Sequence, residues 1–215
     1  MEDWVLKQFL FYRLPKRILD IVVSLVALVV LSPIFLVIAL IIKFSKGTSH
    51  VFYAQDRVGQ GGKHFKIYKF QSMVDNADRI LKSDAQLYQK FVDNGYKLPT
   101  KEDPRITKIG AVLRKTSLDE LPQFWNTLIG NMSIIGPRPV VESELVEYGD
   151  TKRIQKFLSV KPGVFGLWQA SGRSNIGYPE RAEIELDYVD RANLTLDFKI
   201  MFQTVIAILK GDGAF

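Results

Sequence analysis

The segment Ile21–Ile42 constrains the fold more than any other, because nearly all of its side chains are apolar. As one straight helix it would extend about 33 Å, which is enough to cross the hydrocarbon core of a bilayer. Pro33, preceded by Ser32, lies near its middle, and a proline there removes a backbone hydrogen bond and bends the helix. The Ser32 hydroxyl can donate to a carbonyl one turn earlier and reduce the cost of the break. The segment is therefore predicted to form two half-helices around a Ser32-Pro33 break.

Basic residues flank this segment on both sides, with Lys16 and Arg17 before it and Lys43 and Lys46 after it. The positive-inside rule places both flanks on the cytoplasmic face, and half-helices of roughly 15–18 Å would reach only the middle of the bilayer. This pattern indicates a re-entrant helix–break–helix, with a kinked transmembrane helix as an equally good interpretation. The preceding stretch, Met1–Lys16, mixes basic and apolar side chains and is typical of a membrane-interface segment.

The rest of the chain predicts a helix-dominated α+β fold. Alternating residues around a glycine-rich turn in Val51–Phe70 indicate a short β-hairpin, and Asp75–Phe91 and Pro179–Val189 have helical patterns. Val160–Arg173 is rich in turn residues, and Leu196–Leu209 is an amphipathic helix that suits either the core or a membrane surface. We expect a membrane-associated re-entrant region at 1–46 and a compact cytoplasmic catalytic domain at 47–215, with interfacial amphipathic helices.

The net charge of +6 and the isoelectric point of about 9.4 favour anionic partners, which include nucleic acid, anionic lipid and phosphorylated small molecules. The absence of cysteine excludes disulfides and thiolate metal sites. Only two histidines are present, which argues against a histidine-based zinc centre. No nucleic-acid-binding motif is recognisable, so nucleic acid is not the expected partner.

The stretch Arg114–Gln123 reads R-K-T-S-L-D-E-L-P-Q and places Asp119 beside Glu120, with bases before and after the pair. Paired carboxylates next to cations suit Mg²⁺, which prefers oxygen ligands and shares them with substrate phosphates. Spacing alone favours a plainer interpretation, in which Ser117 and Glu120 form a helix-capping box. Pro122 conflicts with that helix. A helix that begins at Pro122 is the alternative, and it would place both acids just ahead of its first turn.

Several motifs follow one another in a single order along nearly the whole chain. They are K-R-I-L-D-I (Lys16–Ile21), Ser32-Pro33, R-V-G and F-K-I-Y-K-F (between Arg57 and Phe70), D-P-R-I-T-K-I-G and L-R-K-T-S-L-D-E-L-P-Q-F-W-N (Asp103–Asn126), G-N-M-S-I-I-G-P-R-P (Gly130–Pro139) and K-P-G-V-F-G-L-W-Q (Lys161–Gln169). With them the chain resembles the bacterial sugar transferases, the monotopic phosphoglycosyl transferases. It departs from their pattern at Gln71, where the family usually has arginine, and Asp93–Glu102 matches no motif.

The resemblance implies that the chain transfers a sugar 1-phosphate from a UDP-sugar to a polyprenyl (undecaprenyl) phosphate and releases UMP. Asp119 would be the nucleophile, forming a covalent aspartyl-phosphosugar intermediate, and Glu120 its partner in holding Mg²⁺. Arg114 and Arg138 would bind phosphate, with Arg105, Lys161 and Arg173 as weaker candidates.

The implied place is the cytoplasmic face of the bacterial inner membrane, in contact with membrane lipids, at the start of glycoconjugate assembly. The sequence predicts no particular oligomeric state. A membrane-anchored basic binding module or scaffold without catalysis is the alternative function.

Overall fold

The computed structural model describes residues 9–94, 98–172 and 175–210. After a π-helical turn at Phe9–Arg13, α2 (Leu14–Val30) and α3 (Ser32–Lys43) follow one another, bent by 60° at their junction. The Ser32 hydroxyl donates to the Val29 carbonyl at 2.7 Å. Pro33 falls in the first turn of α3, where it has no intrahelical hydrogen bond to break. The predicted break and its compensating hydrogen bond are confirmed.

No single helix among the described residues is long and apolar enough to cross a membrane, whereas the bent pair meets that requirement by length and composition when its halves are taken together. The halves are unequal, with 17 residues in α2 and 12 in α3. Residues 1–8 of the interface segment expected at Met1–Lys16 lie outside the described part of the chain. The re-entrant path stays a prediction.

The predicted β-hairpin is confirmed as β1 (Phe52–Val58) and β2 (His64–Phe70), which pair antiparallel around a short 3₁₀ turn at Gln60–Gly62. A second, parallel pair was not predicted: β3 (Ser133–Ile135) with β4 (Gly163–Phe165). A Cβ atom on Gly163 would lie 2.1 Å from the Gly136 nitrogen. Glycine at this position therefore allows the two strands to approach each other closely. The expectation that Val160–Arg173 is rich in turns was wrong at β4.

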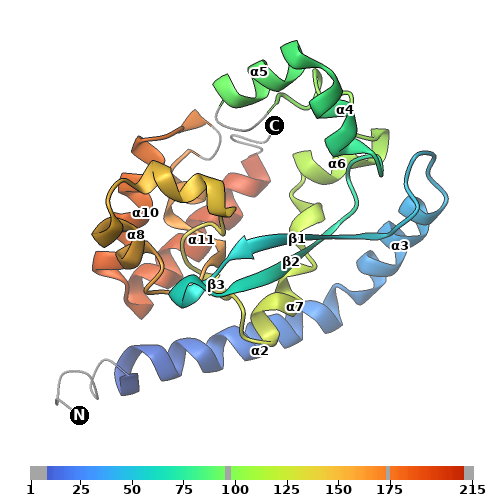
Figure 1. Ribbon diagram of the computed structural model, residues 1–215. Coiled ribbons are helices and arrows are strands. Elements are labelled where there is room, and N and C mark those ends of the chain that lie inside the picture. Colours follow the sequence, from blue (N-terminus) through green and yellow to red (C-terminus); the bar gives the residue numbers. More distant parts are fainter. Residues whose placement is uncertain (1–8, 95–97, 173–174, 211–215) are drawn as a thin grey trace.

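The remaining elements are mostly short helices around the hairpin (Figure 1). They are α4 (Ala77–Ser83), α5 (Ala85–Asp93), α6 (Lys108–Lys115), α7 (Gln123–Leu128), α8 (Thr151–Phe157), α9 (Leu167–Ser171), α10 (Glu180–Arg191) and α11 (Leu194–Lys210), with 3₁₀ helices η3 (Leu118–Glu120) and η4 (Glu142–Tyr148). The helical pattern of Asp75–Phe91 is divided in two because Asp84 is extended and its carboxylate caps α5.

Helix α2 is fastened to the body by buried polar contacts. Asp20 accepts hydrogen bonds from the Ser133 hydroxyl at 2.9 Å and the Ile134 backbone nitrogen at 2.8 Å. Arg17 donates to the Thr127 and Leu128 carbonyls at the end of α7, which satisfies acceptors that a helix C-terminus leaves open. These contacts join the predicted region 1–46 directly to the rest of the chain, while the division into two regions stays a prediction.

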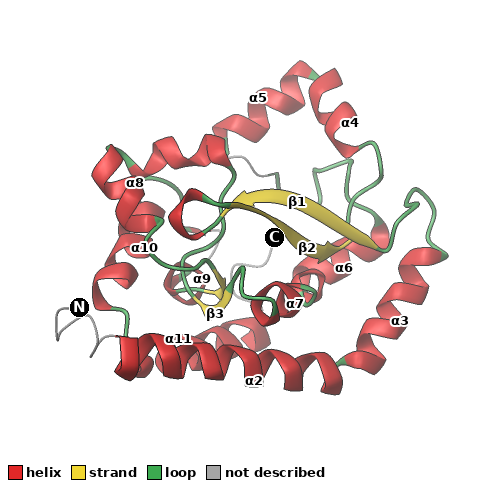
Figure 2. Cartoon of the chain, turned by 60° about the horizontal axis from the view of Figure 1, so that its bottom comes forward, coloured by secondary structure: helices red, strands yellow, loops and turns green. Residues whose placement is uncertain are grey.

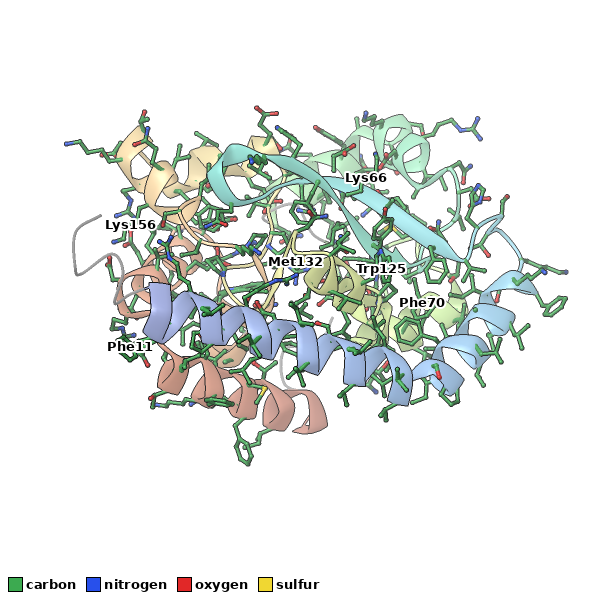
Figure 3. All side chains as sticks on the ribbon, turned by 90° about the horizontal axis from the view of Figure 1, so that it is seen from below. Phe11, Lys66, Phe70, Trp125, Met132 and Lys156 are labelled. Atoms are coloured by element: carbon green, nitrogen blue, oxygen red, sulfur yellow. The ribbon has the colours of Figure 1, made fainter. Side chains whose placement is uncertain are left out.

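The outward face of α2 carries a row of exposed apolar side chains: Ile18, Ile21, Val22, Leu25, Val26, Val29 and Val30. Helix α11 runs alongside α2 (Figures 2 and 3) and lines a shared apolar cavity with it. In α11, Ile200 and Thr204 are buried, whereas Phe198 and Phe202 are exposed. The helix therefore has both a core face and an exposed apolar face, and exposed apolar surface of this extent suits contact with lipid.

We predict that Gly110→Ala destabilises the fold, because its Cβ atom would lie 1.9 Å from the Ser72 carbonyl oxygen in the backbone that follows β2. Alanine normally favours a helix over glycine, so a loss must come from this collision. We expect the free energy of unfolding to fall by about 2–3 kcal/mol, measured by denaturant unfolding in detergent. Gly177→Ala is the control, since nothing lies within 4 Å of its Cβ position. Equal stability of the two variants would contradict the close packing of α6.

Candidate active site

The backbone places the two acids between α6 and α7. Ser117 has φ of 57° and its side chain caps no helix, and the 3₁₀ turn Leu118–Glu120 follows. Helix α7 starts only after Pro122, whose ring suits a helix start because no backbone N–H is needed there. The capping-box interpretation was therefore wrong. The alternative is confirmed: the helix begins at Pro122 and both acids precede it.

Two leucines flank the acidic pair and fix its orientation. Leu118 and Leu121 pack against a buried cluster that contains Ile38 and Ile42 of α3 and Leu113 of α6. Residues three apart in a 3₁₀ turn lie on one side of it. The leucines therefore face the helices, and the two acids are left to face the hairpin.

Glu120 is held by two cations. Its Oε1 atom accepts from Lys69 Nζ of β2 at 2.9 Å and from Arg138 Nη2 at 3.2 Å. Burial on its own would raise the pKa of Glu120, but the charges of Lys69 and Arg138 outweigh it and lower the pKa well below its ordinary value. Burial also lowers the pKa of Lys69, and Glu120 opposes that change. Glu120 is therefore a fixed, ionised carboxylate.

Asp119 has a different environment. It is 7% exposed and makes no hydrogen bond or ion pair with any residue that the structure describes. Burial raises its pKa, Lys69 opposes the rise, and the adjacent negative charge of Glu120 adds to it. Neighbouring carboxylates whose pKa values are pushed apart are typical of sites where two acids have separate roles.

The donor set fits Mg²⁺ but would not by itself enclose a metal ion. No group of three or more His, Asp or Glu side chains that could hold a metal ion occurs among the described residues, and Asp119 and Glu120 would be the protein ligands. Mg²⁺ commonly binds through one or two carboxylates and completes its shell with water and substrate phosphates. Two adjacent carboxylates beside fixed cations match that pattern.

The two principal phosphate-binding candidates both lie beside the acids. Arg114 donates from Nε to the Ser72 hydroxyl at 3.1 Å, and burial lowers its pKa while the charge of Asp119 opposes that effect. Arg138 reaches Glu120, and its guanidinium carbon lies 5.9 Å from the centre of the Trp168 ring. Both side chains are only partly buried, so each retains access to a ligand.

The weaker candidates are placed differently. Arg105 is buried, and its guanidinium donates two hydrogen bonds to Asp103, at 2.7 and 2.8 Å, and lies over the Phe91 ring. Lys161 lies near Arg17 of α2, at the other end of α7 from the acids. Arg173 lies outside the described residues. The structure therefore groups Arg114 and Arg138 with the acidic pair and places Lys161 elsewhere.

Lys69 was not among the predicted site residues. The signal that could have revealed it is strand alternation, because Lys69 shares a face of β2 with Ile67, which is buried. A lysine at an inward position of a strand needs an acidic partner. Gln71, where the family usually has arginine, is buried and donates its amide to the Met73 carbonyl at 2.7 Å, so it does not point a charge at the site.

Comparison with known proteins gives one consistent match. The family model described as "Bacterial sugar transferase" matches residues 11–211. The exopolysaccharide production protein ExoY of Sinorhizobium fredii is 42% identical over 204 residues, which cover 93% of this chain and 88% of that protein.

Two further relatives are longer than this chain. The undecaprenyl-phosphate galactose phosphotransferase of Salmonella typhimurium is 42% identical over 94% of this chain. The UDP-glucose:undecaprenyl-phosphate glucose-1-phosphate transferase of Escherichia coli is 38% identical over 90% of it. The match spans 42% and 40% of those two proteins, so it corresponds to less than half of their length.

We predict that Lys69→Met raises the pKa of Glu120, because the nearest positive charge is removed while burial remains. In the wild type the low pKa of Glu120 gives stability that is complete above its unfolded pKa of about 4.3 and is lost at lower pH. The rise in unfolding free energy between about pH 2 and pH 5 should therefore be shallower in the variant. Carboxyl ¹³C NMR titration gives the pKa directly.

The matched control is Lys66→Met on the same strand. Lys66 is labelled in Figure 3, and its ion pair with Asp56 is exposed on both sides, so its removal should change stability by about 0.5 kcal/mol or less. An unchanged Glu120 titration in the Lys69 variant would show that this ion pair does not hold the carboxylate.

Proposed function

The chain belongs to the bacterial sugar transferase family and is a sugar-phosphate transferase, and we propose that it moves a sugar 1-phosphate from a UDP-sugar to a polyprenyl phosphate at the bacterial membrane. The names of its relatives support both substrates. The observation that carries the proposal is the unequal pair of acids: Glu120 is fixed by two cations, whereas Asp119 has no hydrogen-bond partner among the described residues. The alternative of a scaffold without catalysis would not need this arrangement.

We infer a two-step transfer in which Asp119 is the nucleophile. A carboxylate oxygen of Asp119 attacks the phosphorus that adjoins the sugar, and the bond from that phosphorus to the bridging oxygen breaks. UMP leaves with the bonding electrons, and the sugar phosphate stays on Asp119. An oxygen of polyprenyl phosphate then attacks the same phosphorus and releases Asp119 as a carboxylate. A covalent intermediate of this kind replaces one difficult displacement with two easier ones.

The chain's own cations balance the charges of this reaction. Arg114 and Arg138 lie beside the acids, where they can bind phosphate oxygens and stabilise the negative charge that develops as UMP leaves. Lys69 holds Glu120 at the same time and keeps it ionised. Asp119 and Glu120 would hold Mg²⁺, which when bound would supply positive charge to the substrate phosphates and favour the ionised form of Asp119.

The bent helix pair supports a site at the membrane surface. Both flanks of the pair are basic, its outward face is apolar, and the two leucines that flank the acids pack against α3. We infer that the pair enters and leaves the membrane on the cytoplasmic side. A soluble UDP-sugar and a lipid phosphate could then meet at the acids, where lipid phosphates lie.

We predict that Asp119→Asn abolishes transfer without unfolding the protein. The amide keeps the shape of the side chain but is not a nucleophile, and burial already penalises the ionised carboxylate, so the neutral amide should cost no stability at pH 7. UMP release from a panel of UDP-sugars should fall by about 10³-fold or more. Mass spectrometry of the wild type, incubated with UDP-sugar and no lipid acceptor, should find the sugar phosphate on Asp119.

Asp56→Asn is the control for this substitution, because Asp56 is exposed and its ion-pair partner among the described residues is Lys66. It should leave UMP release unchanged. Full activity of the Asp119→Asn variant, or a sugar phosphate on another residue, would refute Asp119 as the nucleophile.

We predict that transfer requires a divalent cation. Excess chelator should stop UMP release by the wild type, and added Mg²⁺ should restore it, whereas sodium chloride of equal ionic strength should not. The reason is that Asp119 and Glu120 add two negative charges to those of the substrate phosphates, and Lys69 and Arg138 are already paired with Glu120, so the charge that develops on the phosphates needs a further positive charge. Undiminished activity in excess chelator would show that Arg114, Arg138 and Lys69 stabilise the developing charge without a metal ion.

A further inference from the structure

A second pair of cations lies apart from the acidic pair, at the other end of α7. Arg17 comes from the first turns of α2, and Lys161 comes from the segment before β4. The two meet above Gly130, which follows α7. From the point where a Cβ atom of Gly130 would be, Arg17 Nη2 is 3.3 Å away and Lys161 Nζ is 3.7 Å away.

Neither cation forms a direct ion pair with a carboxylate among the described residues. Arg17 donates to two carbonyls, those of Thr127 and Leu128, and Lys161 has no hydrogen bond or ion pair with any residue in the described parts of the chain. The charge of Asp20 acts on both Arg17 and Lys161, but the hydrogen bonds that this carboxylate accepts come from Ser133 and Ile134. Burial lowers the pKa of the Lys161 ammonium, and the charge of Arg17 lowers it further. Two half-buried positive charges side by side gain free energy when an anion joins them.

Gly130 lets the two cations approach the backbone closely, because it has no side chain to displace them. Its φ is +94°, which suits the residue after a helix. Any side chain at this position would begin within 3.7 Å of both nitrogens. These nitrogens lie no more than about 7 Å apart, so one phosphate can bridge them with an oxygen at about 2.8 Å from each.

The surroundings indicate which anion would bind there. Arg17 lies where the exposed apolar row of α2 begins, with exposed Leu14 and Ile18 next to it. A phosphate held at this place would have its attached chains beside that row, at the depth where lipid head groups lie. A nucleotide phosphate would instead place a polar sugar and base against apolar side chains.

We propose that Arg17 and Lys161, brought together at Gly130, bind the phosphate of a membrane lipid. This site is separate from the acids, since α7 with its six residues extends about 9 Å between them. The lipid is either a phospholipid that holds α2 in place or the prenyl phosphate on its way to Asp119. The proposal rests on the membrane location in the proposed function and not on the transfer chemistry.

The test is a binding measurement on the full chain in non-ionic detergent, by isothermal titration calorimetry without UDP-sugar. Two probes distinguish the sources: dihexanoyl phosphatidylglycerol for a phospholipid and farnesyl phosphate for the prenyl acceptor. Lys161→Gln removes one charge-assisted hydrogen bond and should weaken the binding of at least one probe about tenfold. Gly130→Asn places a side chain against both cations while tolerating the left-handed backbone, and it should weaken the binding of the same probe.

Lys152→Gln is the control for charge, because Lys152 is an exposed lysine on α8, and it should bind both probes like the wild type. Weaker binding of farnesyl phosphate by Lys161→Gln and Gly130→Asn would assign the site to the prenyl acceptor. Weaker binding of phosphatidylglycerol by these variants would assign it to a phospholipid. Affinities that are the same in the wild type, Lys161→Gln and Gly130→Asn for both probes would overturn the proposal. UMP release by the same preparations reports on the transfer chemistry independently. A failure of the lipid-site proposal can therefore be told from a failure of the proposed transfer.

Discussion

The packing of Leu118 and Leu121 against the bent helix pair is the contact on which the position of the candidate site depends. Leu118 belongs to the cluster built on Ile38 and Ile42 of α3, and Leu121 belongs both to that cluster and to the one that α2 joins. The two leucines therefore touch both sides of the bend. A straight continuation of α2 would take α3 away from β2 and α6 and would remove the surface on which the acidic turn rests. Both leucines are partly buried, so each contributes less than the roughly 1.5–3 kcal/mol of a fully buried leucine.

The charges of the site depend on a second, polar framework. Arg138 is positioned through its backbone nitrogen, which donates to Glu185 at 3.1 Å, and through the ring of Trp168. Arg181 lies over the same ring at 4.5 Å and pairs with Glu185 and with Glu144. Arginines and glutamates in this number are rarely buried unless they are paired. Removing one of these partners would leave a buried charge without compensation, and Arg138 would lose its fixed place beside Glu120.

What the sequence predicted correctly was signalled locally. Pro33 marks the bend, side-chain alternation marks the hairpin, and Pro122 marks the start of α7, because each acts through the backbone of its immediate neighbours. Strands β3 and β4 have three residues each, which is too short for alternation to show. The contact of Lys69 with Glu120 joins residues 51 positions apart. Such a pairing is decided by how α3, β2 and α6 pack, and no local pattern records it. Asp119 and Glu120 themselves were assigned by family resemblance, since spacing alone favoured a helix cap.

Helix α7 connects the two places where phosphate is proposed to bind. The acids precede its first turn, and Arg17 closes its last turn by donating to two carbonyls. A cation at a helix C-terminus also favours the negative end of the helix dipole. Arg17 therefore stabilises α7 and supplies charge to the proposed lipid site with the same side chain. Because α7 is short and packs on α2, a lipid phosphate held above Gly130 would stand at a fixed distance from Asp119. A carrier lipid bound first at Gly130 would then need to move only about the length of α7 to reach the sugar phosphate.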